Sequence, residues 1–174
     1  MKRLIPLLTL VALAGCATTT PKPAPTTPRA SSDVYRPSDY AWSTAPGTNV
    51  ILGSVAYQTK AGGTWTCAGS SAALTPATPM SAKRINRLYG STEHAVATLD
   101  EVRSRSAGDE APPYVDYVRN TRCDAAGKFA FQGLPDGDWF LVARAQPAKG
   151  GEPNVVILQY VEVRGGRTVT LALK

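Results

Sequence analysis

CDAAGKFAFQGLPDGDWFLVA, residues 123–143, carries the clearest fold information in the sequence. Two short apolar segments lie in this stretch, and a turn containing Asp and Gly precedes each of them. That pattern is typical of β-strands joined by tight turns. Phe129 and Phe131 are two residues apart, so a strand places both rings on one face. We therefore predict two consecutive strands here.

Similar short apolar segments continue on both sides of this stretch. They bring the predicted total to about seven strands and cover residues 50–57, 72–76, 114–122, 155–163 and 168–173. The last two are expected to form a closing hairpin around Gly165 and Gly166, with Val169, Leu171 and Leu173 pointing the same way. The 14 prolines and 15 glycines, with only 7% aromatic residues, favour turns and short strands over long helices. The sequence therefore predicts an all-β domain.

Residues 80–108 interrupt the strand pattern, and we interpret them as an insertion into the domain. Residues 82–89 fit about two turns of helix. Residues 95–102 fit either a strand or a helix, so the pairing order in this part is left open.

Several positions together resemble a carboxypeptidase regulatory-like domain, namely Gly53, Cys67, residues 73–76, residues 124–131, and residues 134–137 before Trp139. The resemblance spans residues 50–173 and is strongest over residues 124–143. It implies a transthyretin-like (prealbumin-like) β-sandwich. In carboxypeptidases this domain accompanies a separate zinc peptidase domain, so the resemblance implies an architecture and not a catalytic activity.

Residues 1–16 resemble a bacterial lipoprotein signal. Lys2 and Arg3 form a short positive region, residues 4–12 are apolar, and residues 13–16, Leu-Ala-Gly-Cys, resemble the lipobox. The apolar run is shorter than the roughly 20 residues that span a bilayer. The resemblance implies cleavage after residue 15 and attachment of a diacylglycerol lipid to Cys16. An ordinary secretory signal with an incidental cysteine is the alternative.

The expected organisation is a signal peptide over residues 1–15, a lipidated tether over residues 16–48, and a β-sandwich over residues 49–174. The tether is rich in Pro and Thr and lacks the apolar groups that would offset the entropy of ordering, so we expect it to be disordered. Tyr35, Tyr40 and Trp42 are unusual for such a linker. Either they fold back on the domain as an arm, or they form an exposed aromatic contact site.

These features predict a lipid-anchored protein of the cell envelope, with the membrane as one partner through Cys16. Ala17 follows the cysteine, and the absence of Asp at that position resembles outer-membrane sorting in bacteria with two membranes. The sequence leaves open which way the protein faces.

The three cysteines divide into one lipid acceptor and one pair. Assigning Cys16 to the lipid leaves Cys67 and Cys123, which we expect to form a disulfide in an oxidising compartment. The loop would close about 56 residues, and the chain-entropy estimate gives about 4 kcal/mol of stabilisation. Metal ligation is the alternative, but His94 is the only histidine that could complete such a site.

The formal net charge is +6 at pH 7, and the basic residues are scattered along the chain. Solvated surface charge is the simplest interpretation, although this balance also suits acidic polymers or anionic lipid head groups. Nucleic acid is not an expected partner, because no helix-turn-helix, zinc or aromatic RNA-binding motif is present.

Catalytic and metal-binding motifs are weak in this sequence. Ser91, His94 and Asp100 supply the residue types of a hydrolytic triad, but no Gly-x-Ser-x-Gly elbow occurs. Asp136 and Asp138 lack the other oxygen ligands of a calcium loop, so a hairpin turn is the simpler interpretation. We therefore predict no catalytic residues, no metal site and no cofactor.

Four aromatic residues, Trp65, Tyr89, Tyr114 and Tyr117, are candidates for a surface on which a sugar or peptide stacks, with core packing as the alternative. The sequence predicts a non-catalytic binding or scaffolding module for an envelope protein. A module that binds peptidoglycan or another polysaccharide is the alternative, and an unrecognised hydrolase is a more remote one.

Overall fold

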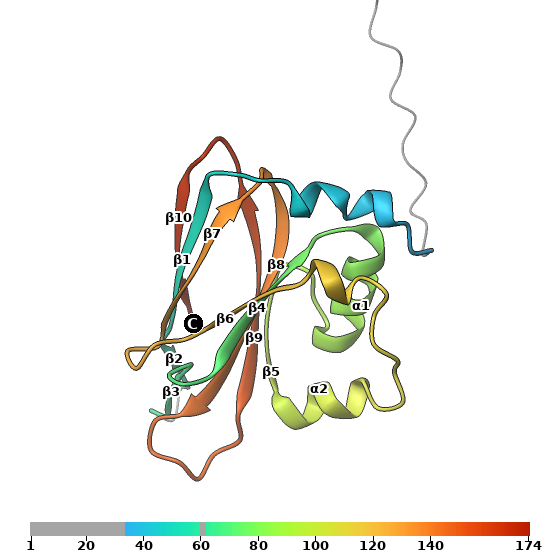
Figure 1. Ribbon diagram of the computed structural model, residues 1–174. Coiled ribbons are helices and arrows are strands. Elements are labelled where there is room, and N and C mark those ends of the chain that lie inside the picture. The colour runs from blue at the N-terminus through green and yellow to red at the C-terminus, as the bar shows by residue number, and fades with distance from the viewer. Residues whose placement is uncertain (1–33, 60–61) are drawn as a thin grey trace, which may run out of the picture. The chain divides into compact units, whose positions relative to one another are not determined.

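The structure is a computed structural model and describes residues 34–59 and 62–174, which belong to one compact unit, Ser31–Lys174 (Figure 1). Cys16, the predicted signal peptide and most of the predicted tether lie outside the described residues. Within the described part of the chain, no helix is both long and apolar enough to span a bilayer.

The described residues form ten strands, two α-helices and three short 3-10 helices. In chain order these are η1 (Pro37–Asp39), η2 (Ala41–Thr44), β1 (Asn49–Val55), β2 (Tyr57–Gln58), β3 (Thr64–Thr66), β4 (Ser71–Pro76), α1 (Pro79–Tyr89), β5 (His94–Thr98), α2 (Leu99–Arg105), η3 (Val115–Tyr117), β6 (Arg119–Arg122), β7 (Lys128–Leu134), β8 (Gly137–Pro147), β9 (Val155–Val163) and β10 (Thr168–Leu173).

The strands make two sheets that face each other as a sandwich (Figure 1). The three-stranded sheet has the order β10-β1-β7, with β1 parallel to β10 and antiparallel to β7. The seven-stranded sheet has the order β2-β3-β8-β4-β6, and β9 joins it by pairing with both β8 and β5. The all-β class predicted from the sequence is confirmed.

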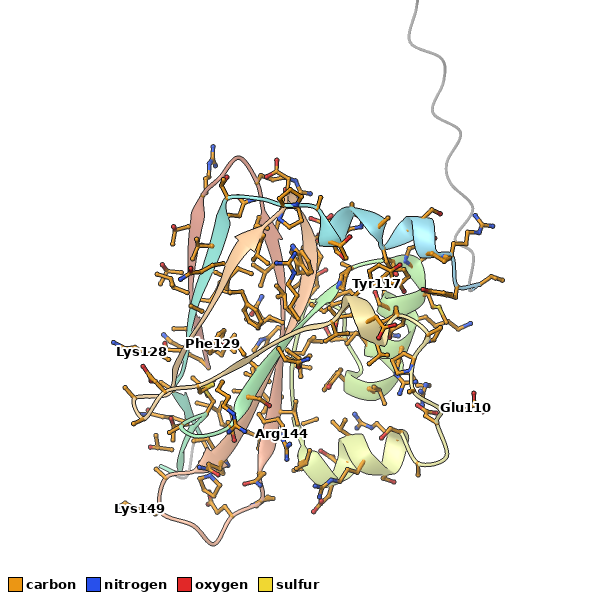
Figure 2. The ribbon with its side chains drawn as sticks, viewed as in Figure 1. Glu110, Tyr117, Lys128, Phe129, Arg144 and Lys149 are labelled. Carbon is orange, nitrogen blue, oxygen red and sulfur yellow. A yellow bond between two sulfur atoms is a disulfide. The ribbon has the colours of Figure 1, made fainter. Side chains whose placement is uncertain are left out.

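The main core lies between the two sheets and follows the alternation of the strands. Trp139, Leu141 and Ala143 of β8 are fully buried in this core, since every second residue of the strand faces the other sheet. Phe129 and Phe131 of β7 face them from the three-stranded sheet, with ring centroids 6.0 Å apart. Figure 2 shows Phe129 between the sheets, whereas its neighbour Lys128 points to the outer side.

The predicted closing hairpin is wrong in its pairing. The strands β9 and β10 occur where expected, but β9 pairs with β5 and β8 while β10 pairs with β1, so the turn at residues 164–167 carries the chain from one sheet to the other. Val169, Leu171 and Leu173 do point the same way, toward the core between the sheets. Burial of this apolar face against the opposite sheet therefore replaces pairing with the preceding strand.

The predicted strand over residues 114–122 is also shorter than expected. Only β6 at its end is a strand, and residues 115–117 form the 3-10 helix η3. Tyr114 is buried against Tyr40, with stacked rings 5.1 Å apart, so the large residues here pack on a neighbouring segment and do not line a sheet face.

The insertion contains a helix, a strand and a second helix. The helix α1 begins with a capping box between Thr78 and Ser81, and it ends at Gly90, whose φ of 75° lies in the left-handed region that glycine tolerates. The strand β5 then extends the seven-stranded sheet, and α2 begins with a second capping box between Thr98 and Glu101. Residues 95–102 are thus a strand in their first half and a helix in their second.

The segment before β1 packs on the sandwich as an arm, so the ordered fold begins before the predicted boundary at residue 49. Tyr40 is fully buried, and its hydroxyl accepts a hydrogen bond from Thr78 Oγ1 at 2.7 Å. The Trp42 ring meets the Trp139 ring edge-on, with centroids 4.9 Å apart. It also covers Gly137, where an added Cβ would lie 1.8 Å from the indole, so the close approach requires glycine.

Candidate functional site

The outer face of the seven-stranded sheet is covered by helix over only part of its area. Phe140 of β8 and Leu158 of β9 point outward and are buried beneath Ile85 of α1. Farther along β8, the outward positions are the exposed Arg144 and Gln146. Arg144 lies outside the area that α1 covers (Figure 2). The apolar half of this face is thus closed, while the polar half is open to solvent.

The open half contains a groove of about 620 Å³, which we name the polar groove. Its walls come mainly from β4, β6 and β8, together with the residue that precedes β9. The polar residues that line it include Ser71, Asn120, Arg122, Arg144, Gln146 and Asn154. Amide and guanidinium groups are planar hydrogen-bonding groups in fixed geometries, and hydroxyls both donate and accept, so this lining suits a ligand rich in polar groups.

Strand register places the two arginines on either side of Ser71. Ser71 of β4 pairs with Arg122 of β6, and Ala72 pairs with Ala143 of β8, so Arg144 lies next to Ser71 on its other side. Neighbouring strands are about 4.8 Å apart, which puts the Cα atoms of the arginines about 10 Å from each other. Side chains of this length can converge on one group above Ser71.

The wall of the polar groove is held by the disulfide between Cys67 and Cys123, whose Cα atoms are 5.8 Å apart. The predicted pairing is therefore confirmed. The Cys123 N–H donates to the Ser70 carbonyl at 3.0 Å, and the Ser70 N–H donates to the Cys67 carbonyl at 2.7 Å. Gln146 Nε2 donates to the Ala68 carbonyl at 3.0 Å, which fixes its amide and leaves its oxygen as an acceptor.

Neither Arg122 nor Arg144 has an ion-pair or hydrogen-bond partner for its guanidinium among residues 34–59 and 62–174. Arg122 lies at the sheet edge and also borders a hollow that Asp124 lines. Asp124 Oδ1, however, accepts from the N–H groups of Ala126 and Lys128 at 2.9 and 2.8 Å. Asp124, the carboxylate nearest to Arg122 along the chain, is thus engaged by the backbone of its own turn.

A second groove, of about 380 Å³, lies between α1 and the segment before η3 and is also basic. Its cations differ from those of the polar groove because Arg84 and Arg87 both pair with Asp109. The hydrogen bond from Arg87 holds the pKa of Asp109 below its ordinary value. Arg87 also donates to the Arg105 carbonyl at 2.6 Å, so this cluster ties α1 to the end of α2.

The four aromatic candidates do not form one surface. Trp65 is buried, and its Nε1 donates to the Pro153 carbonyl at 3.0 Å. Tyr114 is buried too, and burial raises its pKa to about 12. Tyr117 is half-buried with its ring 5.3 Å from the ring of Tyr40, and Tyr89 is half-buried at the end of α1. Core packing, the alternative interpretation, therefore holds for Trp65 and Tyr114.

The residue types of a triad are not assembled into one. His94 is exposed at the start of β5, and Ser91 Oγ accepts from the backbone N–H groups of Glu93 and His94 at 3.0 and 3.3 Å. Asp100, on α2, is exposed and pairs with Arg103. Among the residues that the structure describes, no hydrogen bond joins the His94 ring to Ser91 or Asp100.

The two aspartates of the β7–β8 turn serve the fold. Asp136 Oδ1 accepts from Asn49 Nδ2 at 2.9 Å and from the Gly165 N–H at 2.8 Å, and these hydrogen bonds lower the pKa of the carboxyl. Asp138 pairs with Arg164 at 2.8 Å. No cluster of three or more metal-ligating side chains occurs within residues 34–59 and 62–174.

The residues of the polar groove were not singled out from the sequence. Their signal is an alternation in which Arg144 and Gln146 lie between the buried Ala143 and Ala145, as on a strand with one solvated face. That pattern could have placed Arg144 on an open sheet face. It could not have placed Arg122 beside Arg144. These two residues become neighbours only through the register that β6 and β8 each form with β4.

No protein-family model and no curated protein matches this chain. A solved structure from Pseudomonas aeruginosa, described as "a putative carbohydrate binding protein", is similar to this one with a TM-score of 0.56. The two chains are 21% identical, and the match covers 80% of this chain and 96% of the other. At this level of identity the similarity shows a shared fold.

Proposed function

We propose that this protein is a non-catalytic, lipid-anchored protein of the bacterial cell envelope whose β-sandwich binds a polysaccharide in the polar groove. The observation that carries the proposal is the groove itself, where planar amides, guanidinium groups and a hydroxyl line an open strip of sheet. A polysaccharide offers many hydroxyl groups in an extended chain, which suits such a strip. The description of the similar Pseudomonas aeruginosa structure supports the same class of ligand.

The anchor in this proposal is the diacylglycerol on Cys16, with the chain cleaved after residue 15 and the membrane as a partner. If the source has two membranes, Ala17 directs the protein to the outer one. The proposal also retains the carboxypeptidase regulatory-like resemblance as the origin of the sandwich. A Cys16→Ser variant is expected to lose labelling by a palmitate analogue and to leave the membrane fraction. Unchanged labelling and fractionation would contradict the anchor.

Polysaccharide binding is tested by titrating the full chain, purified in detergent, with neutral and acidic bacterial glycan fragments, including peptidoglycan fragments. We expect saturable binding of at least one class by calorimetry. Asn120→Ala and Asn154→Ala each remove hydrogen bonds to the ligand and should weaken binding about tenfold. Gln132→Ala removes an exposed amide from the outer side of β7 and is the matched control, which should bind as the unchanged chain does. Binding by none of the fragments would refute the proposal.

A specific observation favours a second function, the scaffolding of an envelope protein. Leu52 is 41% exposed on the outer face of the three-stranded sheet, where Ala130 and Thr170 flank it in register. This part of the face forms a hollow of about 500 Å³, whose lining also includes Arg122, Asp124 and Lys128. Chemical cross-linking in intact cells should recover one envelope protein, and Leu52→Glu should abolish its recovery. Recovery of glycan fragments alone would reject this second function.

A further inference from the structure

We infer that the polar groove selects glycans that carry an acidic group, a carboxylate or a phosphate, and that Arg122 and Arg144 hold this group above Ser71. The inference rests on the proposed function and names the class of ligand. It follows from the placement of the two arginines, the absence of a neutralising acid, and the positions of the surrounding amides.

The register makes the two arginines a pair. Arg122, Ser71 and Arg144 form one row across β6, β4 and β8, and all three point to the outer face of the sheet. With about 10 Å between their Cα atoms, the guanidinium groups can approach the same anion from opposite sides. Each guanidinium can bind a carboxylate or a phosphate with two parallel hydrogen bonds, which a neutral hydroxyl cannot match.

The charge of this row has no counter-charge inside the polar groove, and Asp124 lies in the lining of the other hollow that Arg122 borders. The polar groove has no acidic residue in its lining, and neither guanidinium has a partner within residues 34–59 and 62–174. Two other arginines of the fold, by contrast, are occupied. Arg164 pairs with Asp138, and Arg119 donates to the Ser43 carbonyl at 2.7 Å while its guanidinium covers the ring of Trp139. A ligand anion would supply the missing counter-charge in the polar groove.

The amides lie on both sides of the arginine row. Asn120 is two residues before Arg122 on β6, while Gln146 is two residues beyond Arg144 on β8. Because β6 and β8 are both antiparallel to β4, they run in the same direction, so these amides are on opposite sides of the row. An acidic group at the centre therefore leaves the amides to bind sugar hydroxyls on each side of it.

The test compares glycans that differ only in charge. Tetragalacturonate carries carboxylates, and its methyl ester has the same hydroxyl groups without the charge. A phosphorylated mannan and its neutral parent mannan separate phosphate from carboxylate as the acidic group. Binding of each probe to the full chain is measured by calorimetry at low and at high salt. We expect at least one acidic probe to bind about tenfold or more tightly than its neutral partner. High salt should weaken the binding of that acidic probe.

Variants assign the preference to the two arginines. Arg122→Gln and Arg144→Gln should each reduce binding of the acidic probe about tenfold and reduce binding of the neutral probe much less. Arg122→Lys keeps the charge and should retain part of the affinity. Arg103→Gln removes the same charge from the exposed face of α2 and is the matched control, which should have no effect.

The outcomes separate this inference from the function on which it rests. If acidic and neutral probes bind equally and the arginine variants bind as the unchanged chain does, the charge selection is wrong while polysaccharide binding stands. If Arg103→Gln weakens binding as much as the groove variants do, the preference comes from overall charge and the inference is also wrong. If no glycan binds, the proposed function fails and the inference fails with it.

Discussion

The outer face of the seven-stranded sheet has two halves that the same strands supply. In one half, Phe140 and Leu158 lie beneath α1 and are buried. In the other, Arg144 and Gln146 continue the same face of β8 and remain exposed. The change from apolar to polar residues along a single strand face marks the place where the helical cover ends. One half stabilises the fold, and the other is available to a ligand.

The two halves also differ in how they are held. The covered half is held by packing, since Ile85 of α1 contacts its apolar residues and the buried Tyr40 of the arm hydrogen-bonds Thr78 at the start of that helix. The open half has no such cover. Its wall is held by the covalent bridge of Cys67 and Cys123 and by backbone hydrogen bonds around Ser70. A change to either support should therefore affect one half more than the other.

The largest effect is expected from removing the bridge in the double variant Cys67→Ser, Cys123→Ser. The bridge joins residues 56 positions apart, so its loss should lower the free energy of unfolding by about 4 kcal/mol. Urea denaturation measures this loss, and the unchanged chain under reducing conditions is the control, which should match the variant. Glycan binding should weaken as well, because the groove wall is released. An unchanged denaturation midpoint would show that the wall is held without the bridge.

A smaller loss of stability is expected from Phe140→Ala, which creates a cavity in the covered half. The ring is 3% exposed and packs against Ile85 and Leu158, so its removal should cost about 3 kcal/mol. The matched control is Arg144→Ala, on the same strand and the same face but in the open half, which should change stability by no more than about 0.5 kcal/mol. Equal losses in the two variants would remove the distinction between the halves.

The division of the sheet face into a covered and an open half could be predicted from the sequence only in part. The strands, the disulfide and the same-side placement of Phe129 and Phe131 follow from local alternation and from the parity of the cysteines. Tyr40 and Trp42 are unusual for a solvated linker, and an arm packed on the domain was one of the two interpretations that they allowed. These features depend on residues that are near one another in sequence or, for the disulfide, on the number of cysteines.

The polar groove depends on register between strands that are distant in sequence, and no local pattern encodes that. Arg122 and Arg144 become neighbours only through Ser71 of β4. The same reason accounts for the wrong closing hairpin, because the burial of Leu173 against the opposite sheet decided the pairing of β10. The insertion was ambiguous because a five-residue strand, β5, runs directly into a capped helix, and each is too short to show a clear period.

A third effect, smaller again, concerns Tyr114 at the margin of the covered half. Burial raises the pKa of its phenol from 10 to about 12, so the folded state favours the neutral form. The stabilisation from this group is complete below pH 10, where both states are neutral, and it is lost as the pH rises through 12. Unfolding should therefore become easier over that interval, and Tyr114→Phe should reduce the slope. Equal slopes for the two chains in denaturation at pH 9 to 12 would contradict this assignment.

The smallest effect has the opposite sign and lies in the open half. Arg122 and Arg144 are like charges on either side of Ser71, and no acid in the groove lining offsets their repulsion. Arg144→Gln should therefore stabilise the fold slightly, by up to about 0.5 kcal/mol at low salt, and the gain should fade as salt screens the charges. Denaturation at two salt concentrations measures it, and Arg103→Gln, which breaks an exposed ion pair with Asp100, should give no gain. A loss of stability in Arg144→Gln would mean that this arginine supports the sheet. A gain, together with weaker binding of an acidic glycan, would mean that the charge is retained for its ligand at the expense of the fold.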